Sequence, residues 1–90
     1  MLTYHDCIGL SELTPEEVAA VAEHEHIPEM VAIEVGNYII HADDGVLRIR
    51  RIILEDIEAA ERRNNAEHAL TLKLVLKHFI DTHPDATAGK

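Results

Sequence analysis

The sequence contains little that could cross-link the chain or anchor it in a membrane. Cys7 is the only cysteine, so no intramolecular disulfide can form, and nothing indicates an oxidising compartment. No apolar run approaches the roughly 20 residues that a membrane-spanning helix needs. No basic segment leads into an apolar one near the first residue, which argues against a signal peptide. These absences predict a cytoplasmic protein without a membrane partner.

Aromatic and basic residues are also scarce. Aromatic residues make up 3% of the 90 residues and tryptophan is absent, so Val, Ile, Leu and Ala have to fill the core. Only 8 basic residues accompany 17 acidic ones, and the formal charge is −9. Such an acidic surface repels nucleic-acid phosphates. Gly-rich phosphate loops and nucleophile elbows are missing, so we predict no catalytic residues and do not expect an enzyme.

Capping signals predict two helices in the first half of the chain. Thr14 can cap a helix, Pro15 suits its first position, and Glu17 completes a capping box. This helix should stop near His24–His26, because Pro28 disfavours helical geometry at the residue before it. We expect Pro28 to be the first residue of the second helix.

The second half predicts two longer helices. Asp44-Gly45 would suit a β-hairpin over Tyr38–Arg50, but the apolar residues that follow recur at helical spacing and do not alternate as in a strand. We therefore expect a helix over about Gly45–Arg63. Asn65 can cap a final helix over about Ala66–Thr82, which His83-Pro84 would end.

Together these segments predict an all-α fold, an irregular bundle of four main helices plus a short N-terminal helix capped by Thr3. One helical domain should cover residues 1–83, and residues 84–90 should form a flexible tail. The apolar face of Ala66–Ile80 is unusually broad. Such a face indicates a helix that either lies at the centre of the bundle or also contacts a partner.

Histidines and carboxylates cluster in one place, the joint Glu23–Glu29 between the first two helices. Both side-chain types bind zinc and iron, and the spacing of Glu23 and His26 is that of the Glu-x-x-His motif in di-iron bundles. No second Glu-x-x-His occurs, and His24 and His26 converge only if the helix ends between them. The cluster is either a site for a divalent metal with Glu23, His24 and His26 as ligands, or a polar helix end.

A helix-turn-helix outline over Thr14–Ile40 is the third interpretation, since two short helices meet there at a tight joint. The joint lacks the usual glycine, and the second helix begins with Glu29, which phosphates would repel. The arginines of Arg48–Arg51 and Arg62-Arg63 fit a solvated helix face better than a surface that binds nucleic acid. There Arg51 is expected to pair with Glu55, and Glu58 with Arg62.

The pattern Asp6-Cys7-x-Gly9-Leu10-Ser11-Glu12-Leu13-Thr14, followed by Ala22-Glu23-His24-Glu25-His26-Ile27-Pro28-Glu29, resembles a family of short bacterial proteins. The similarity continues through Gly45-Val46, Arg48–Arg51 and His78–Ile80. The resemblance implies a bacterial, stand-alone, all-helical protein. It assigns no activity, cofactor or catalytic residue.

Our leading hypothesis is a non-catalytic interaction or structural module that binds a protein partner or itself, as a homodimer through Ala66–Ile80. The alternative is a zinc- or iron-binding helical protein that uses Glu23, His24 and His26. A DNA-associated regulator ranks third, because the acidic composition disfavours a nucleic-acid partner, and an independent enzyme has the least support.

Overall fold

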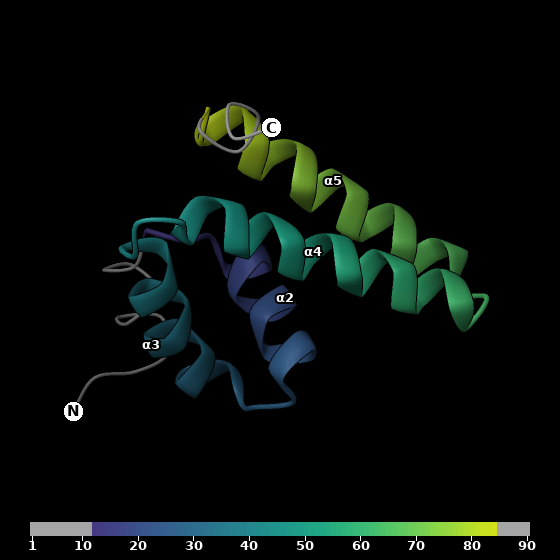
Figure 1. The fold of residues 1–90 in the computed structure, drawn as a ribbon. Helices are drawn as coiled ribbons and strands as arrows, with labels where there is room; N and C mark the ends of the chain where they lie inside the picture. Colours follow the sequence, from purple (N-terminus) through teal and green to yellow (C-terminus); the bar gives the residue numbers. More distant parts are fainter. Residues whose placement is uncertain (1–11, 85–90) are drawn as a thin grey trace.

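The computed structural model describes residues 12–84, and within them it contains four α-helices and no strand. They are α2 (Pro15–Glu25), α3 (Glu29–Ile40), α4 (Gly45–Arg62) and α5 (Ala66–Thr82) (Figure 1). The predicted all-α fold with four main helices is confirmed. The short helix predicted from Thr3 and residues 85–90 of the predicted tail lie outside the described residues.

The capping signals before α2 form as predicted. The Thr14 hydroxyl accepts a hydrogen bond from the Glu17 amide (3.2 Å), and the Glu17 carboxylate accepts one from the Thr14 amide (3.0 Å). The helix ends at Glu25, where His26 adopts left-handed backbone geometry with φ 59°. Pro28 differs from the prediction: it is the extended N-cap of α3, and its carbonyl accepts from the Ala32 amide at 2.9 Å.

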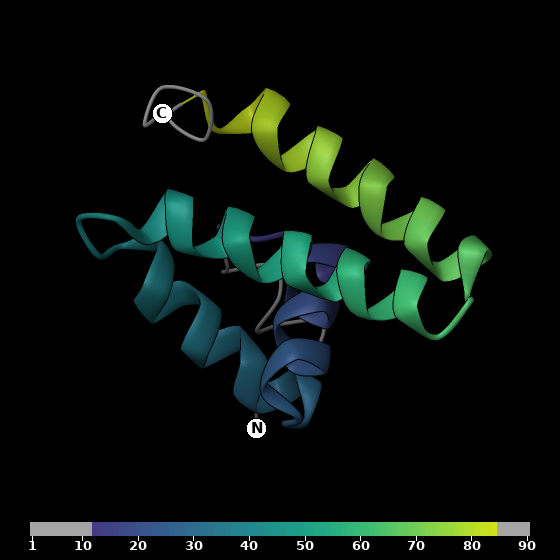
Figure 2. The ribbon, with the colours of Figure 1, turned by 45° about the vertical axis from the view of Figure 1, so that its right-hand side comes forward.

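Helix α4 is the centre of the bundle. It packs against α2, α3 and α5, and Figures 1 and 2 show it running between α5 on one side and the α2–α3 pair on the other. Ile49 and Ile53, one turn apart on its inner face, are fully buried. Each such side chain contributes about 1.5–3 kcal/mol of hydrophobic stabilisation relative to an exposed one. The central position is therefore that of α4, not that of the Ala66–Ile80 segment.

Helix α5 folds back along α4 through a short turn. Asn64 is left-handed (φ 59°), and the Asn65 side chain accepts a hydrogen bond from the His68 amide at 3.2 Å, which confirms the predicted cap. Four α5 side chains are buried: Ala69, Leu72, Val75 and Phe79. Leu70 and Leu74 point away from this core and are 60% and 61% exposed.

Gly36 marks a close approach between α3 and the segment before α2. A Cβ atom at this position would lie 2.6 Å from Leu13 Cδ1, and Leu13 is itself buried. The glycine at this position therefore allows the close packing of α3 against Leu13.

Candidate functional site

The polar joint predicted from the sequence lies where the C-terminal end of α2 meets α4 and the start of α5. Side chains from all three helices gather there, and α4 brings carboxylates that are far away in the sequence. We call this group the junction, and it consists of Glu23, His24, Glu55, Asp56, Arg63 and His68.

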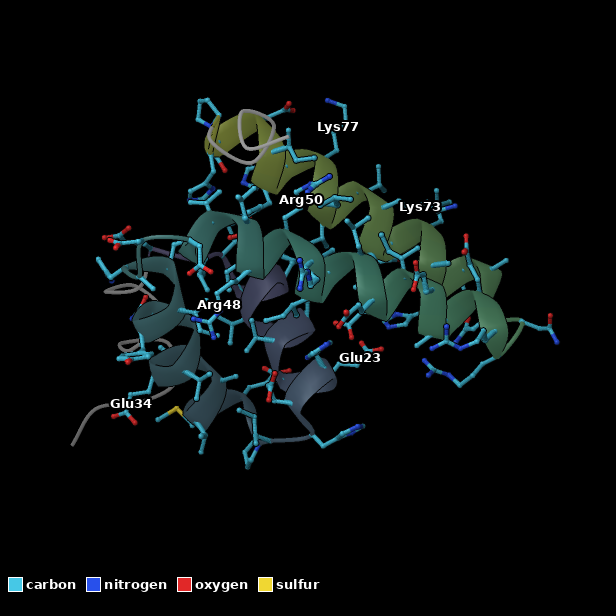
Figure 3. All side chains as sticks on the ribbon, in the orientation of Figure 1. Glu23, Glu34, Arg48, Arg50, Lys73 and Lys77 are labelled. Carbon is cyan, nitrogen blue, oxygen red and sulfur yellow. The ribbon has the colours of Figure 1, made fainter. Side chains whose placement is uncertain are left out.

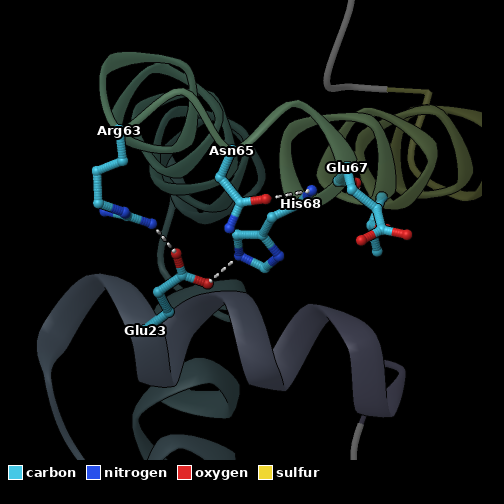
Figure 4. Close-up of polar contacts among 6 residues, drawn as sticks. Glu23, Arg63, Asn65, Glu67 and His68 are labelled. Atoms are coloured by element: carbon cyan, nitrogen blue, oxygen red, sulfur yellow. Dashed lines mark hydrogen bonds and ion pairs between the residues drawn. The ribbon is translucent and has the colours of Figure 1, made fainter.

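Glu23 connects α2 to the turn between α4 and α5. Its Oε1 accepts a hydrogen bond from His68 Nε2 at 2.8 Å, and its Oε2 lies 3.6 Å from Arg63 Nη2 (Figure 4). The Asn65 cap holds the amide of His68, so the first turn of α5 presents the imidazole to Glu23. The Glu23 side chain is 31% exposed, so each contact contributes only about 0–1 kcal/mol. These contacts position α5 more than they stabilise the fold.

His24 lies between two carboxylates. Its Nε2 is 2.6 Å from Glu55 Oε1 and its Nδ1 is 3.0 Å from Glu25 Oε2. Burial lowers the pKa of His24, but the hydrogen bonds to Glu55 and Glu25 and the negative charge of Asp56 outweigh it and raise the pKa above 6.5. Imidazolium is therefore the favoured form at mildly acidic pH.

The ion pairs expected along α4 do not form in the described part of the chain. Glu55 pairs with His24 instead of Arg51, and Glu58 and Arg62 are not paired with each other. The bond from His24 connects two helices and is 2.6 Å long. It replaces a local pair between exposed side chains, which would stabilise an isolated helix by only about 0.3–0.5 kcal/mol.

Glu55, Asp56, Arg63 and His68 were not predicted as site residues, and Asp56 is the buried one among them. Its side chain is 4% exposed, and its Oδ2 has no hydrogen-bond partner. Burial is the main cause that raises its pKa to about 7, and the negative charge of Glu23 adds to it. A signal was present, because Ile49, Ile53, Asp56 and Ala60 follow the spacing of one buried helical stripe.

A groove of about 830 Å³ opens beside the junction, between the end of α2 and α4. Its apolar lining consists of Ala22, Ile27 and Ala59. Side chains that can carry a charge line the rest of the groove: Glu23, His24, His26, Glu55, Asp56, Glu58, Arg62 and Arg63. The buried carboxyl of Asp56 is thus part of a wall that faces an open space.

The three predicted metal ligands are not brought to one point. Glu23 contacts His68 and Arg63, His24 contacts Glu25 and Glu55, and His26 is exposed at the left-handed end of α2. Within residues 12–84, no group of three or more His, Cys, Asp or Glu side chains is placed to hold a metal ion. A zinc or iron site at Glu23, His24 and His26 stays a prediction.

A second surface lies on the exposed side of α5, and we call it the α5 face: Glu67, Leu70, Leu74 and Lys77. Shallow grooves border the two leucines. One of about 290 Å³ runs beside Leu70, with Glu61 and Lys73 at its edge, and one of about 470 Å³ runs beside Leu74 toward Pro15. Exposed leucines next to apolar hollows are typical of a contact surface.

Most of the basic side chains labelled in Figure 3, within the described part of the chain, lie close to a carboxylate. Figure 3 shows Arg48 and Arg50 on α4, with Lys73 and Lys77 on α5. Three of these four have a carboxylate close by: Arg48 has Asp44 at 4.0 Å, Lys73 has Glu61 at 3.1 Å, and Lys77 has Asp81 at 3.0 Å. The helix-turn-helix interpretation stays a prediction, without an added observation in its favour.

No match appears when the chain is compared with protein-family models, curated proteins and solved structures. The resemblance to short bacterial proteins therefore remains an interpretation of the sequence. Among the described helices, none combines the length and the apolar character that crossing a membrane requires.

Proposed function

We propose that this protein is a non-catalytic interaction module that associates with a second copy of itself through the α5 face. The observation that carries the proposal is the exposure of Leu70 and Leu74, 60% and 61%, on a helix whose opposite side is buried in the bundle. The two leucines are one turn apart, so they form one continuous apolar strip. Contiguous apolar surface bordered by polar residues is a common feature of protein–protein contact sites, which supports the proposal.

The charges beside the leucines favour a second copy in antiparallel orientation. Glu67 precedes Leu70 by three residues, and Lys77 follows Leu74 by three, so the face is symmetric in position but opposite in charge at its two ends. A two-fold axis near Leu72 sets Leu70 against the partner's Leu74, and Glu67 against the partner's Lys77. A parallel pair would set like charges against each other.

The size of the strip sets the expected affinity. Covering the exposed portions of four leucines contributes about 4–7 kcal/mol if full burial of one is worth about 1.5–3 kcal/mol. Association of two proteins costs about 4–15 kcal/mol in lost freedom. This gain covers only the lower part of the range of that cost, so we expect a weak dimer that forms mainly at high protein concentration.

Sedimentation equilibrium over a wide concentration range tests the proposal. Leu74→Glu places a charge in the centre of the strip and is expected to make the protein monomeric. Tyr38→Glu is the matched control, since Tyr38 is an exposed apolar residue on α3, 78% exposed, and this variant should dimerise like the parent. A parent chain that remains monomeric at millimolar concentration, or a Leu74→Glu variant that still dimerises, would refute the proposal.

Charge exchange tests the orientation separately. Glu67→Lys and Lys77→Glu should each weaken the dimer, because each places two like charges together, and the double variant should restore it. A dimer that depends on Leu74 but shows no restoration in the double variant would contradict the antiparallel arrangement while leaving the module itself in place.

A further inference from the structure

The groove beside α4 contains a buried acceptor without a donor. Asp56 is 4% exposed, its Oδ2 has no hydrogen-bond partner, and the residue lines the groove. Buried carboxyl oxygens are normally paired, because an unpaired one has given up its bonds to water without replacement. A ligand that brings an N–H donor to Asp56 would supply the missing bond.

The charge around Asp56 favours a cation at this end of the groove. Glu55 and Glu58 line the same stretch of α4, and the C-terminal end of α2, which carries the negative end of its helix dipole, opens beside them. Three of the basic groups near Asp56 already have acidic partners: His24 contacts Glu55, and Arg63 and His68 contact Glu23.

The remaining lining sets the shape of the ligand. Ala22, Ile27 and Ala59 form an apolar stretch next to the carboxylates, which suits a short alkyl chain. Arg62 also lines the groove and has no ion-pair partner among the described residues, so a carboxylate at the far end of the ligand would find a positive charge there.

We propose that this groove binds a primary alkylammonium group, with the Asp56 carboxylate as its buried acceptor and the alkyl chain lying on Ala22, Ile27 and Ala59. This site is separate from the α5 face and does not rest on dimerisation. Asp56 is surrounded by Glu23 and His24 of α2, Glu55 of α4 and His68 of α5, so the ammonium enters an existing network of charges.

The test is a titration of the isotope-labelled full chain, followed by NMR at pH 8 and constant ionic strength. The probes are n-butylamine, 5-aminopentanoate, which adds a carboxylate for Arg62, and tetramethylammonium, which is a cation without N–H donors. We expect saturable shifts of the Asp56 and Ala59 amides with both amines and none with tetramethylammonium. Tighter binding of 5-aminopentanoate than of n-butylamine would place the carboxylate at Arg62; equal binding would identify a plain amine site.

Variants connect the binding to Asp56. Asp56→Asn removes the charged acceptor and should weaken n-butylamine binding about tenfold or more, whereas Asp43→Asn, the same charge change in an exposed loop, should leave it unchanged. Circular dichroism verifies that Asp56→Asn is folded. If that variant does not fold, Glu58→Gln replaces it in the titration and is expected to weaken binding severalfold. Lowering the pH from 8 to 6 should weaken binding to the parent chain about tenfold, because the proton competes for a carboxyl with a pKa of about 7.

Four results would overturn the proposal. They are the absence of saturable binding at pH 8, equal binding of tetramethylammonium, unchanged affinity in Asp56→Asn, and Asp56-dependent binding of Zn²⁺ by a chain that does not bind the amines. The last result would assign the groove to a metal ion instead.

Discussion

Replacing Asp56 with asparagine should stabilise the protein at alkaline pH and have little effect at acidic pH. Burial raises the pKa of this carboxyl from 3.8 to about 7, so the folded chain holds the proton more tightly than the unfolded chain. The stability that this preference provides is complete below pH 3.8 and is lost as the pH rises through about 7. Asparagine has the shape of the protonated carboxyl and cannot ionise, so it avoids the loss.

The magnitude follows from the shift. A difference of about 3 pKa units at 1.36 kcal/mol per unit gives about 4 kcal/mol as the upper limit above pH 8. Rearrangement of Glu23 and entry of water reduce that value, so we expect Asp56→Asn to gain about 1–3 kcal/mol at pH 8.5. At pH 4 the two proteins should differ by less than about 0.5 kcal/mol, the level of an ordinary neutral substitution.

Urea denaturation followed by circular dichroism at pH 4, 7 and 8.5 measures these differences, with Asp43→Asn as the control for a lost surface charge. The control should show no pH-dependent gain. A loss of stability in Asp56→Asn at pH 8.5, or an equal change at all three pH values, would refute a raised pKa at Asp56. A carbon-detected NMR titration of the Asp56 carboxyl provides the direct check, with an expected midpoint near 7.

Two further predictions concern the backbone. His26 has a left-handed backbone conformation that is unfavourable for a residue with a Cβ atom and that glycine adopts freely. His26→Gly should therefore raise the free energy of unfolding by about 1 kcal/mol. Urea denaturation measures this change, and an unchanged midpoint would contradict the prediction. Gly45→Ala would place a Cβ atom on the Ile39 carbonyl oxygen and should lower the free energy of unfolding by about 3 kcal/mol or more. Gly36→Ala would meet only the end of the flexible Leu13 side chain and should lower it less. Thermal unfolding tests this order, and a lower midpoint for Gly36→Ala than for Gly45→Ala would contradict it.

The parts of the fold that were predictable from the sequence depend on residues close together in the chain. The Thr14–Glu17 capping box, the stop before Pro28 and the Asn65 cap each join groups at most four residues apart, so no knowledge of packing was needed. Pro28 was predicted as the first residue of α3 and is its N-cap instead. The sequence could not separate the two positions, because both accept the fixed φ angle of proline.

Features that depend on which helix faces meet were not predictable. The contact between Glu23 and His68 spans 45 residues, and the pairing of Glu55 with His24 displaced the local pair with Arg51. The broad apolar pattern of Ala66–Ile80 indicated either a central helix or a helix that also contacts a partner, and it could not decide between the two. The structure places α4 at the centre and leaves the outer leucines of α5 exposed.

The proposed alkylammonium site would account for a feature of the junction that folding does not require, the buried carboxyl of Asp56. Caps and buried apolar residues account for the helices from Leu13 to His41, and an apolar residue at position 56 would complete the buried stripe of α4 without the cost of a buried carboxyl. The partly exposed contacts of Glu23 and His24 add too little to offset that cost. The Asp56 carboxyl lowers the stability of the fold above pH 7, lines a groove and lacks a hydrogen-bond donor. This arrangement is expected where a bound cation supplies the hydrogen bond and the positive charge that the folded chain does not provide.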